Sequence, residues 1–423
     1  MSFARLRLGA LLLAIAAFAA VAVGLRRGMP FNRDGWLYWQ GSVSILSGLG
    51  YRDFAGEPIT AWPPVYSVYL AFCQLALGVS AWAIVISTAL ATAAAVATWF
   101  LLLAWFARER GRAPKDVLCA LAFVSAVLAL SARNVRSENL FHAVLPLLLL
   151  FALRARVSTT PRTFLIWSGL AGVALLVSLL IRNASLAFWP ALLAVLLLNR
   201  RISWRARGAG CGLVTALALP IWLALRAWLG QLGEHPLQLG GRFGFAEYLL
   251  QLVAGIDRNT GVRLLGLPLL ALLAAGLLRA DTARASAGEP DRLGRAALLF
   301  TAVAACALLA IFNLTRVWDK PESRFTLFAT LVIGGLGVLD LPALLRRRWL
   351  ALALVLLFAE PTLRLAKNTI LGRGPRDADF RAESLRGFAP SATAIDPEHV
   401  RRAPAPSGDL VLVSPPYPEG IRF

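Results

Sequence analysis

Charged residues are scarce in this sequence: they make up 16% of its 423 residues, whereas hydrophobic residues make up 58%. Several long runs carry no charge at all, among them 8–23, 90–105 and 351–358. A water-soluble protein could not bury so much apolar surface, which excludes an ordinary soluble domain. Apolar segments of about 20 residues cross the hydrocarbon core of a bilayer as helices. Because such segments recur along the chain, the composition predicts an all-α polytopic membrane protein.

Acidic residues are the rarer of the two charges. Lys and Arg number 43 against 23 Asp and Glu, which gives a formal net charge of +20. The basic residues gather between apolar segments, in the groups Arg108, Arg110, Arg112 and Lys115; Arg200, Arg201, Arg205 and Arg207; and Arg346, Arg347 and Arg348. Basic loops of this kind lie on the cytoplasmic side of membrane proteins. We therefore interpret the charge as a topology signal and expect no nucleic-acid partner.

Cysteine residues are few, and the glycine-rich motifs that bind nucleotides are absent from the sequence. The four cysteines are widely spaced and lie mostly in apolar runs, at Cys73, Cys119, Cys211 and Cys306. Their spacing indicates neither a CxxC metal site nor a disulfide framework, and it predicts small residues of the core. The sequence contains no G-x-G-x-x-G motif and no P-loop. We therefore expect no nucleotide cofactor.

Placing the basic groups inside predicts the order of the membrane helices. Expected helices lie near 8–24, 81–106, 116–132, 139–155, 164–181, 184–198, 209–229, 263–279, 296–314, 326–342 and 349–364. They make about eleven crossings, with the C-terminus outside. Residues 1–366 then form a transmembrane domain, and residues 367–423 form a small external tail.

The first apolar run has two interpretations. Arg5 and Arg7 precede it, and Ala19, Ala20 and Ala22 near its end are small enough for cleavage, as in a secretory signal. We favour an uncleaved anchor because the membrane domain needs a first helix. In both cases the next loop begins outside the cytoplasm.

The apolar stretch 65–78 does not fit the series of crossings. It has only about 14 residues and follows Pro63 and Pro64, which favours an interfacial or re-entrant helix. A crossing at this point would place the basic group at 108–115 outside and invert every later loop. The first external loop, 26–81, is therefore expected to be a structured surface element that contains interfacial helices.

The first external loop contains the most informative motifs. These are Asp34-Gly-Trp-Leu-Tyr38, Gly48-Leu-Gly-Tyr51 and Trp62-Pro-Pro-Val-Tyr66. Their order resembles that in the GT-C superfamily of membrane glycosyltransferases, especially protein O-mannosyltransferases and lipid A aminoarabinose transferases. Gly35 stands where the mannosyltransferases carry a second acid. Weaker similarities occur at Arg136-Ser-Glu138, at Arg182 and at Glu322-Ser-Arg324-Phe325.

The resemblance implies a GT-C-like fold and the transfer of a hexose or pentose from a polyprenyl-phosphate donor. The acceptor would be a glycan, a lipid or a protein at the external face. An inverting transfer needs a base, and Asp34, with a reference pKa of about 3.9, is ionised and able to orient a hydroxyl. The departing phosphate needs cations, for which Arg182, Arg324 and Lys320 are suited. The remaining candidates are Glu138, as support for an acceptor or for a divalent cation such as Mg or Mn, and Tyr38, Tyr51, Trp62 and Tyr66 in the substrate loop.

Each candidate also has a structural interpretation. Asp34 could cap a surface helix that starts at Gly35. Glu138 could pair with Arg133 or Arg136 in its own loop. Interfacial anchoring would explain the three phosphate-binding candidates, Arg182, Arg324 and Lys320, and the loop tryptophans. His142 lies one turn after Glu138, which would suit a metal pair, but we interpret it as a satisfied polar residue of the bundle.

Two other function classes stay open. A transporter or flippase of lipid-linked substrates would carry ionisable residues or broken helices at the midplane and show repeated halves. Here the charges concentrate outside the predicted helices, which favours the transferase. A non-catalytic scaffold with the same fold is the second alternative. High Ala, Leu and Arg usage favours a bacterial source, which would place the protein in the inner membrane with its site facing the periplasm.

Overall fold

The structure is a computed structural model of the chain, and it describes residues 3–25, 33–53, 56–60, 62–132, 135–229, 266–286, 293–315 and 327–344. Within these ranges the protein is all-α, and the β-type pairing is an isolated antiparallel bridge between Arg52 and Pro58. The expected helix 349–364 and the expected tail 367–423 lie outside the described residues. The all-α fold class predicted from composition is confirmed.

The long helices follow the predicted order. They are α1 (Phe3–Gly24), α4 (Ala81–Glu109), α5 (Pro114–Ser131), α6 (Ser137–Val157), α7 (Pro161–Ile181), α9 (Trp204–Trp228), α11 (Gly266–Ser286), α12 (Leu293–Thr315) and α13 (Leu327–Leu344). The expected helix 184–198 is composite, because a 3-10 turn, η1 (Asn183–Ala187), leads into the short helix α8 (Phe188–Leu197). Seven helices of the described part are long and apolar enough to cross a membrane, namely α1, α4, α5, α6, α7, α9 and α12.

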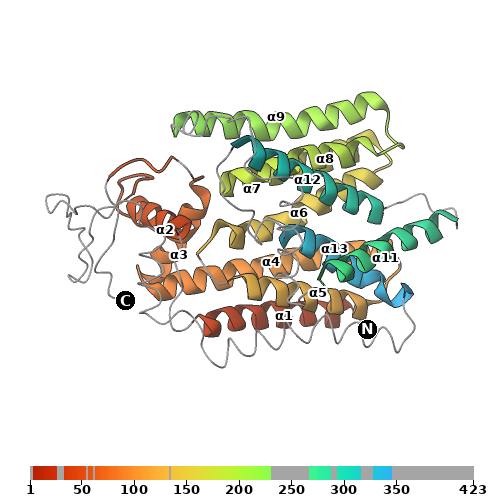
Figure 1. Ribbon diagram of the computed structural model, residues 1–423, viewed down its shortest axis with the longest axis horizontal. Helices are drawn as coiled ribbons and strands as arrows, with labels where there is room; N and C mark the ends of the chain where they lie inside the picture. Colours follow the sequence, from red (N-terminus) through yellow and green to blue (C-terminus); the bar gives the residue numbers. More distant parts are fainter. Residues whose placement is uncertain are drawn as a thin grey trace.

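The helices run side by side, with α1 and α9 on opposite flanks of the bundle (Figure 1). These two flanking helices are the least enclosed of the membrane-spanning helices. In the apolar 18-residue segment of each, 22% of the residues are buried, compared with 56–61% in α4, α5 and α6. Large apolar side chains therefore face outward, including Leu8, Leu11 and Ile15 on α1 and Ile221 on α9. Such faces need a lipid environment. The protein is an integral membrane protein.

Close helix packing in the bundle depends on small residues. Helix α9 lies against α7, where a Cβ added at Gly210 would meet the Phe164 ring and, at 2.9 Å, Ser168 Oγ. The spacing of Gly208 and Gly212 indicates a helix-packing motif, but a Cβ at either position would meet nothing within 4 Å. The glycine in contact with the neighbouring helix is therefore the one between them.

Two short helices, α2 (Arg33–Leu46) and α3 (Val65–Leu77), lie at one end of the bundle (Figure 1). With 13 residues, α3 is too short to cross a bilayer, in agreement with its prediction as a non-spanning helix. It ends at Gly78, which has a φ of 79°, and Ser80 then caps α4 by accepting a hydrogen bond from the Ala83 amide at 3.2 Å.

The first loop is a packed unit. A cluster of buried residues joins the end of α1, α2, α3, the start of α4 and the end of α5; it includes Val21, Trp36, Tyr38, Trp39, Tyr66, Leu70, Ile84 and Ala129. Buried polar contacts fix α3 to its neighbours. Gln74 Nε2 donates to Ser42 Oγ on α2 at 2.6 Å, and the Tyr69 hydroxyl donates to the Ser87 carbonyl on α4. The expectation of a structured first loop is confirmed for the described residues.

The opposite end of the bundle holds the two basic groups within the described ranges, 108–115 and 200–207. Asn199, after α8, donates to the carbonyls of Ala155 and Ser158 at 2.8 and 2.9 Å, which joins it to the end of α6. Arg110, after α4, forms ion pairs with Asp281 on α11 and Asp340 on α13. These contacts place the C-terminal ends of α4, α6, α8, α11 and α13 at one end of the bundle. The positions of the basic loops in the sequence predict this arrangement.

Candidate functional site

Asp34 lies in the first turn of α2, at the end of the bundle that carries the first loop. The helix begins at Arg33, so Asp34 is inside it rather than preceding a helix that starts at Gly35. Its side chain is half-buried, and a carboxylate in a first turn is stabilised by the partial positive charge of the helix N-terminus. Asp34 thus lies at the edge of a packed loop, in the first turn of a helix.

Tyr38 lies one turn after Asp34 and is 2% exposed. Its ring packs edge-on against that of Tyr66, with 5.0 Å between centroids and 88° between planes, and its carbonyl accepts a hydrogen bond from Ser67 Oγ at 2.8 Å. Burial first, and then the nearby Tyr51, raise the pKa of the Tyr38 hydroxyl well above its usual value.

Both carboxylates of the candidate site act on the Tyr38 hydroxyl. Asp34 and Glu138 add to the rise in its pKa, which the neighbouring Ser137 side chain opposes. An acid on α2 and an acid on α6 therefore lie near one phenol. The sequence spacing shows only that Asp34 and Tyr38 share a helix face; the approach of Glu138 results from packing of the loop on the bundle.

The other aromatic residues of the loop surround this phenol. The Tyr51 hydroxyl donates to the Pro63 carbonyl at 3.5 Å, and burial raises its pKa, with Ser67 acting in the opposite direction. Tyr66 is fully buried, and Trp62 packs half-buried against the same cluster. Tyr38 and Tyr66, predicted for the substrate loop, thus belong to the buried cluster that packs the loop on the bundle.

Glu138 forms an ion pair with Arg182, with 3.2 Å between Oε1 and Nη2. Glu138 is in the first turn of α6, and Arg182 directly follows α7, so the pair joins two helix ends. Their side chains are 7% and 13% exposed. Arg182 is therefore part of a buried ion pair and not a lone interfacial cation. Of the loop partners considered for Glu138, Arg133 lies outside the described residues.

His142 lies one turn beyond Glu138 on α6 and is 2% exposed. Neither of its ring nitrogens has a hydrogen-bond partner within the described part of the chain, so the expectation of a satisfied polar residue is wrong there. Ser185, in the 3-10 turn after Arg182, is 1% exposed, and its hydroxyl has no partner within the same part. Ser185 was not predicted from the sequence. For His142, its position one turn after Glu138 was the sequence signal that indicated a possible role in the site.

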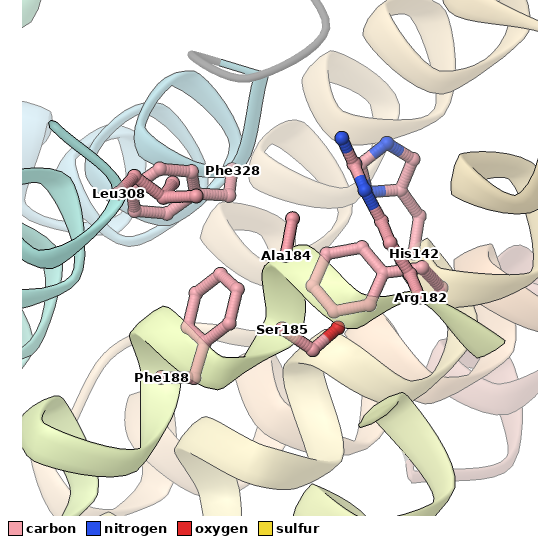
Figure 2. Close-up of a pocket in the computed structure, with 8 residues that line it drawn as sticks. His142, Arg182, Ala184, Ser185, Phe188, Leu308 and Phe328 are labelled. Carbon is pink, nitrogen blue, oxygen red and sulfur yellow. The ribbon is translucent and has the colours of Figure 1, made fainter. Parts of the chain in front are cut away.

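His142, Arg182 and Ser185 line one cavity (Figure 2). Its empty volume, including the part open to the outside, is about 280 Å³. The nitrogens of His142 and Arg182 lie at one side, and apolar side chains complete the wall: Phe141, Ala184, Phe188, Leu308 and Phe328. Polar groups therefore converge at one side of a mostly apolar cavity.

The described residues do not fit a divalent cation held by the protein. No group of three or more His, Cys, Asp or Glu side chains comes together in the described ranges, and the Glu138 carboxylate faces Arg182. Lys320 and Arg324, the other phosphate-binding candidates, lie outside the described residues.

No protein-family model and no curated protein matches the chain. Among solved structures, ArnT from Cupriavidus metallidurans in the apo state has a TM-score of 0.59 at 17% identity, covering 88% of this chain and 67% of that chain. The same protein bound to undecaprenyl phosphate has a TM-score of 0.59 at 16% identity, and the match covers 89% of this chain and 68% of that chain. An Archaeoglobus fulgidus oligosaccharyltransferase in complex with Zn and sulfate has a TM-score of 0.46 at 15% identity, and the match covers 85% of this chain and 52% of that chain. The ArnT match confirms the fold expected from the first loop: this chain has the all-α GT-C fold.

Proposed function

We propose that the protein is a membrane glycosyltransferase that transfers a hexose or pentose from a polyprenyl-phosphate donor to a hydroxyl of an acceptor. The observation that carries this proposal is the buried ion pair between Glu138 and Arg182, with Asp34 on α2 of the packed first loop. It brings an acid and a cation to the same end of a membrane bundle. The likeness to ArnT, which has been captured with undecaprenyl phosphate, supports the choice of donor.

Asp34 serves as the base in this proposal. In an inverting transfer the acceptor oxygen attacks the anomeric carbon, the bond from that carbon to the phosphate oxygen breaks, and the acceptor proton passes to a base. Asp34 is half-buried and lies in the first turn of α2, so its carboxylate is accessible enough to accept that proton. An aspartate is a weak base, so its main contribution is to orient the hydroxyl.

Arg182 stabilises the departing phosphate. Negative charge develops on the lipid phosphate as the sugar leaves, and a guanidinium that is already in position stabilises it. Arg has five donors, so Arg182 can keep its contact with Glu138 and still donate to a phosphate oxygen. Glu138 then acts as a positioning residue that fixes the direction of the guanidinium.

The proposal places the site at the external face of a bacterial inner membrane. The described basic groups, at 108–115 and 200–207, lie at the end of the bundle opposite α2 and α3, and basic ends face the cytoplasm. A polyprenyl donor fits this position, because its tail lies in the bilayer while its head group reaches the interface. The acceptor is a glycan, a lipid or a protein on that side.

The test is Asp34→Asn in membrane vesicles supplied with a polyprenyl-phosphate sugar. We expect transfer to fall by at least about a hundredfold, because general-base catalysis contributes roughly 10²–10⁴. Donor binding should be unchanged. Asp53→Asn is the matched control, since Asp53 is in the same loop but accepts a hydrogen bond from the Glu57 amide at 2.9 Å, within a turn. Full transfer by Asp34→Asn would exclude Asp34 as the base.

The alternative is a transporter or flippase of lipid-linked substrates. One observation bears on it: Arg110, Asp281 and Asp340 are ionisable residues buried among helices, as transporters often have. They lie near the ends of α4, α11 and α13, however, and they pair with one another. Movement of a lipid-linked sugar across the membrane that persists in Asp34→Asn, with no transfer by the wild-type protein, would support the transporter.

A further inference from the structure

Arg154 is a half-buried arginine in the last turn of α6, at the basic end of the bundle. Its guanidinium lies over two indole rings. The guanidinium carbon is 4.5 Å from the ring centroid of Trp167 on α7 and 5.8 Å from that of Trp105 on α4. Helix α6 packs against both of these helices (Figure 1). Arg154 is therefore held in one position at the junction of three helices.

The hydrogen-bond donors of this guanidinium are not used by the neighbouring protein. Stacking on an indole occupies the face of a guanidinium, whereas its five N–H groups point outward in its plane. Among the described residues Arg154 has no ion-pair partner, and its Nε has no hydrogen-bond partner. Arg207 differs, because it lies over the Trp204 ring and also donates from Nη1 to the Leu197 carbonyl at 2.9 Å. The donors of Arg154 are thus available to a ligand with a strong acceptor.

The surface beside Arg154 faces the hydrocarbon chains of the bilayer. Leu101 lies one turn before Trp105 and is 51% exposed, and Leu170 lies about one turn after Trp167 and is 38% exposed. Helix α4 runs towards the basic end of the bundle, and α7 runs away from it. Both leucines therefore lie on the side of Arg154 that is nearer the middle of the membrane. A ligand at Arg154 needs an apolar body on that side.

The opposite side of Arg154 carries further positive charge. Arg108, in the last turn of α4, is 77% exposed, and its contact with Glu109 at 3.4 Å is a surface pair of little strength. A guanidinium between basic residues and an apolar surface fits a lipid phosphate with acyl chains attached. The excess of positive charge disfavours a zwitterionic head group, because its ammonium group would approach Arg108. The charge therefore selects a lipid with a net negative head group.

We infer that an anionic phospholipid of the cytoplasmic leaflet binds at this junction. Its phosphodiester accepts hydrogen bonds from the Arg154 guanidinium, and its acyl chains lie along Leu101 and Leu170. The indoles of Trp105 and Trp167 hold the guanidinium in place for the phosphate. The lipid then joins the ends of α4, α6 and α7. This site is at the other end of the bundle from α2, so the inference does not rest on the proposed sugar transfer.

Native mass spectrometry of the full-length protein, titrated with phosphatidylglycerol or phosphatidylcholine, tests the inference. The wild-type protein should bind its first phosphatidylglycerol at least about fivefold more tightly than phosphatidylcholine. Arg154→Gln should weaken that binding by about tenfold or more, the effect of one hydrogen bond to a charged group. Arg162→Gln is the matched control, since it removes the same charge from an exposed position near the start of α7. It should change the affinity by no more than about threefold.

Two outcomes of the titration would overturn the inference. Equal affinity of the wild-type protein for the two lipids would show that the head-group charge is not selected. Equal losses in Arg154→Gln and Arg162→Gln would show that only general positive charge attracts the lipid. Arg154→Lys adds a finer test, because it keeps the charge and loses the planar set of donors; its affinity should lie between those of the wild type and the glutamine variant.

Thermal unfolding in nanodiscs separates lipid binding from a structural role. The wild-type protein should unfold at a higher temperature when phosphatidylglycerol is added to phosphatidylcholine nanodiscs. Arg154→Gln should lose most of this increase, and Arg162→Gln should keep it. An equally large increase in Arg154→Gln, with lower stability in both membranes, would assign Arg154 to the fold and overturn the inference. If the glutamine variant does not fold, Arg154→Lys, which keeps a cation over the indoles, provides the same comparison.

Discussion

The buried phenol of Tyr38 gives the stability of the protein a pH dependence. The raised pKa means that the folded protein holds the phenol proton more tightly than the unfolded chain does. The resulting stability is fully present below the unfolded pKa of about 10 and is lost as pH rises towards the folded value. We expect the unfolding temperature to fall above pH 10, and to fall less steeply in Tyr38→Phe. Parallel curves for the two proteins would contradict the assignment.

The ion pair between Glu138 and Arg182 makes a second prediction at the residue scale. Glu138→Gln leaves a mostly buried guanidinium without its carboxylate, which should lower stability by on the order of 3 kcal/mol. Adding Arg182→Gln removes the uncompensated charge, so the double variant should regain part of that stability. Neither variant should transfer sugar, because the phosphate-binding cation is misplaced or absent. A double-mutant cycle of thermal unfolding measures the coupling, and additive losses would contradict it.

At the scale of elements, α9 offers a prediction with two internal controls. Gly210→Ala places a methyl group against the Phe164 ring and Ser168 Oγ, so α9 must move away from α7. Overpacking of this kind costs about 1–3 kcal/mol. Gly208→Ala and Gly212→Ala meet nothing within 4 Å and improve helix propensity by up to about 1 kcal/mol. Unfolding of the three variants in detergent checks the order; equal effects would contradict the contact.

The helices were predictable because their signals are local. Apolar length and basic loops gave their order, and the shortness of the apolar stretch 65–78, about 14 residues, indicated that it does not cross the membrane. The turn η1 was not predicted, because 184–198 reads as one apolar run in which the 3-10 turn leaves no hydropathy signal. The contact of Gly210 with α7 was not predictable, because the spacing of glycines along α9 does not show which face meets α7.

The site was predictable only in part, since its residues come from separate helices. Asp34, Tyr38, Tyr51 and Tyr66 could be proposed as site residues because one loop carries them in an order that resembles a known family. The ion pair between Glu138 and Arg182 depends on how α6 and α7 end beside each other, which sequence spacing does not show. The unsatisfied state of His142 and Ser185 likewise requires knowledge of everything that surrounds them.

For the whole molecule, the two ends of the bundle differ in chemistry. One end carries the acids and aromatic residues of the first loop, and the other carries a buried charge network. In that network Arg110 pairs with Asp281 and Asp340, and Arg112 also pairs with Asp340, at 2.7 Å. The Arg295 amide donates to Asp281 at 2.6 Å. The network joins the turn after α4 to α11, α12 and α13, and so connects early and late parts of the chain.

Removing Arg110 should therefore destabilise the whole bundle. Arg110→Met leaves two buried carboxylates without their main partner, which costs roughly 3–5 kcal/mol for a broken buried pair. Arg108→Met is the matched control; its side chain is 77% exposed and its pair with Glu109 is a surface contact, so at most about 1 kcal/mol should be lost. Replacing Arg110, Asp281 and Asp340 together by Met, Asn and Asn should recover much of the stability, because no buried charge among the three then lacks a partner. Thermal unfolding in nanodiscs measures all three proteins, and equal losses for Arg110→Met and Arg108→Met would show that the network does not hold the ends of the helices together.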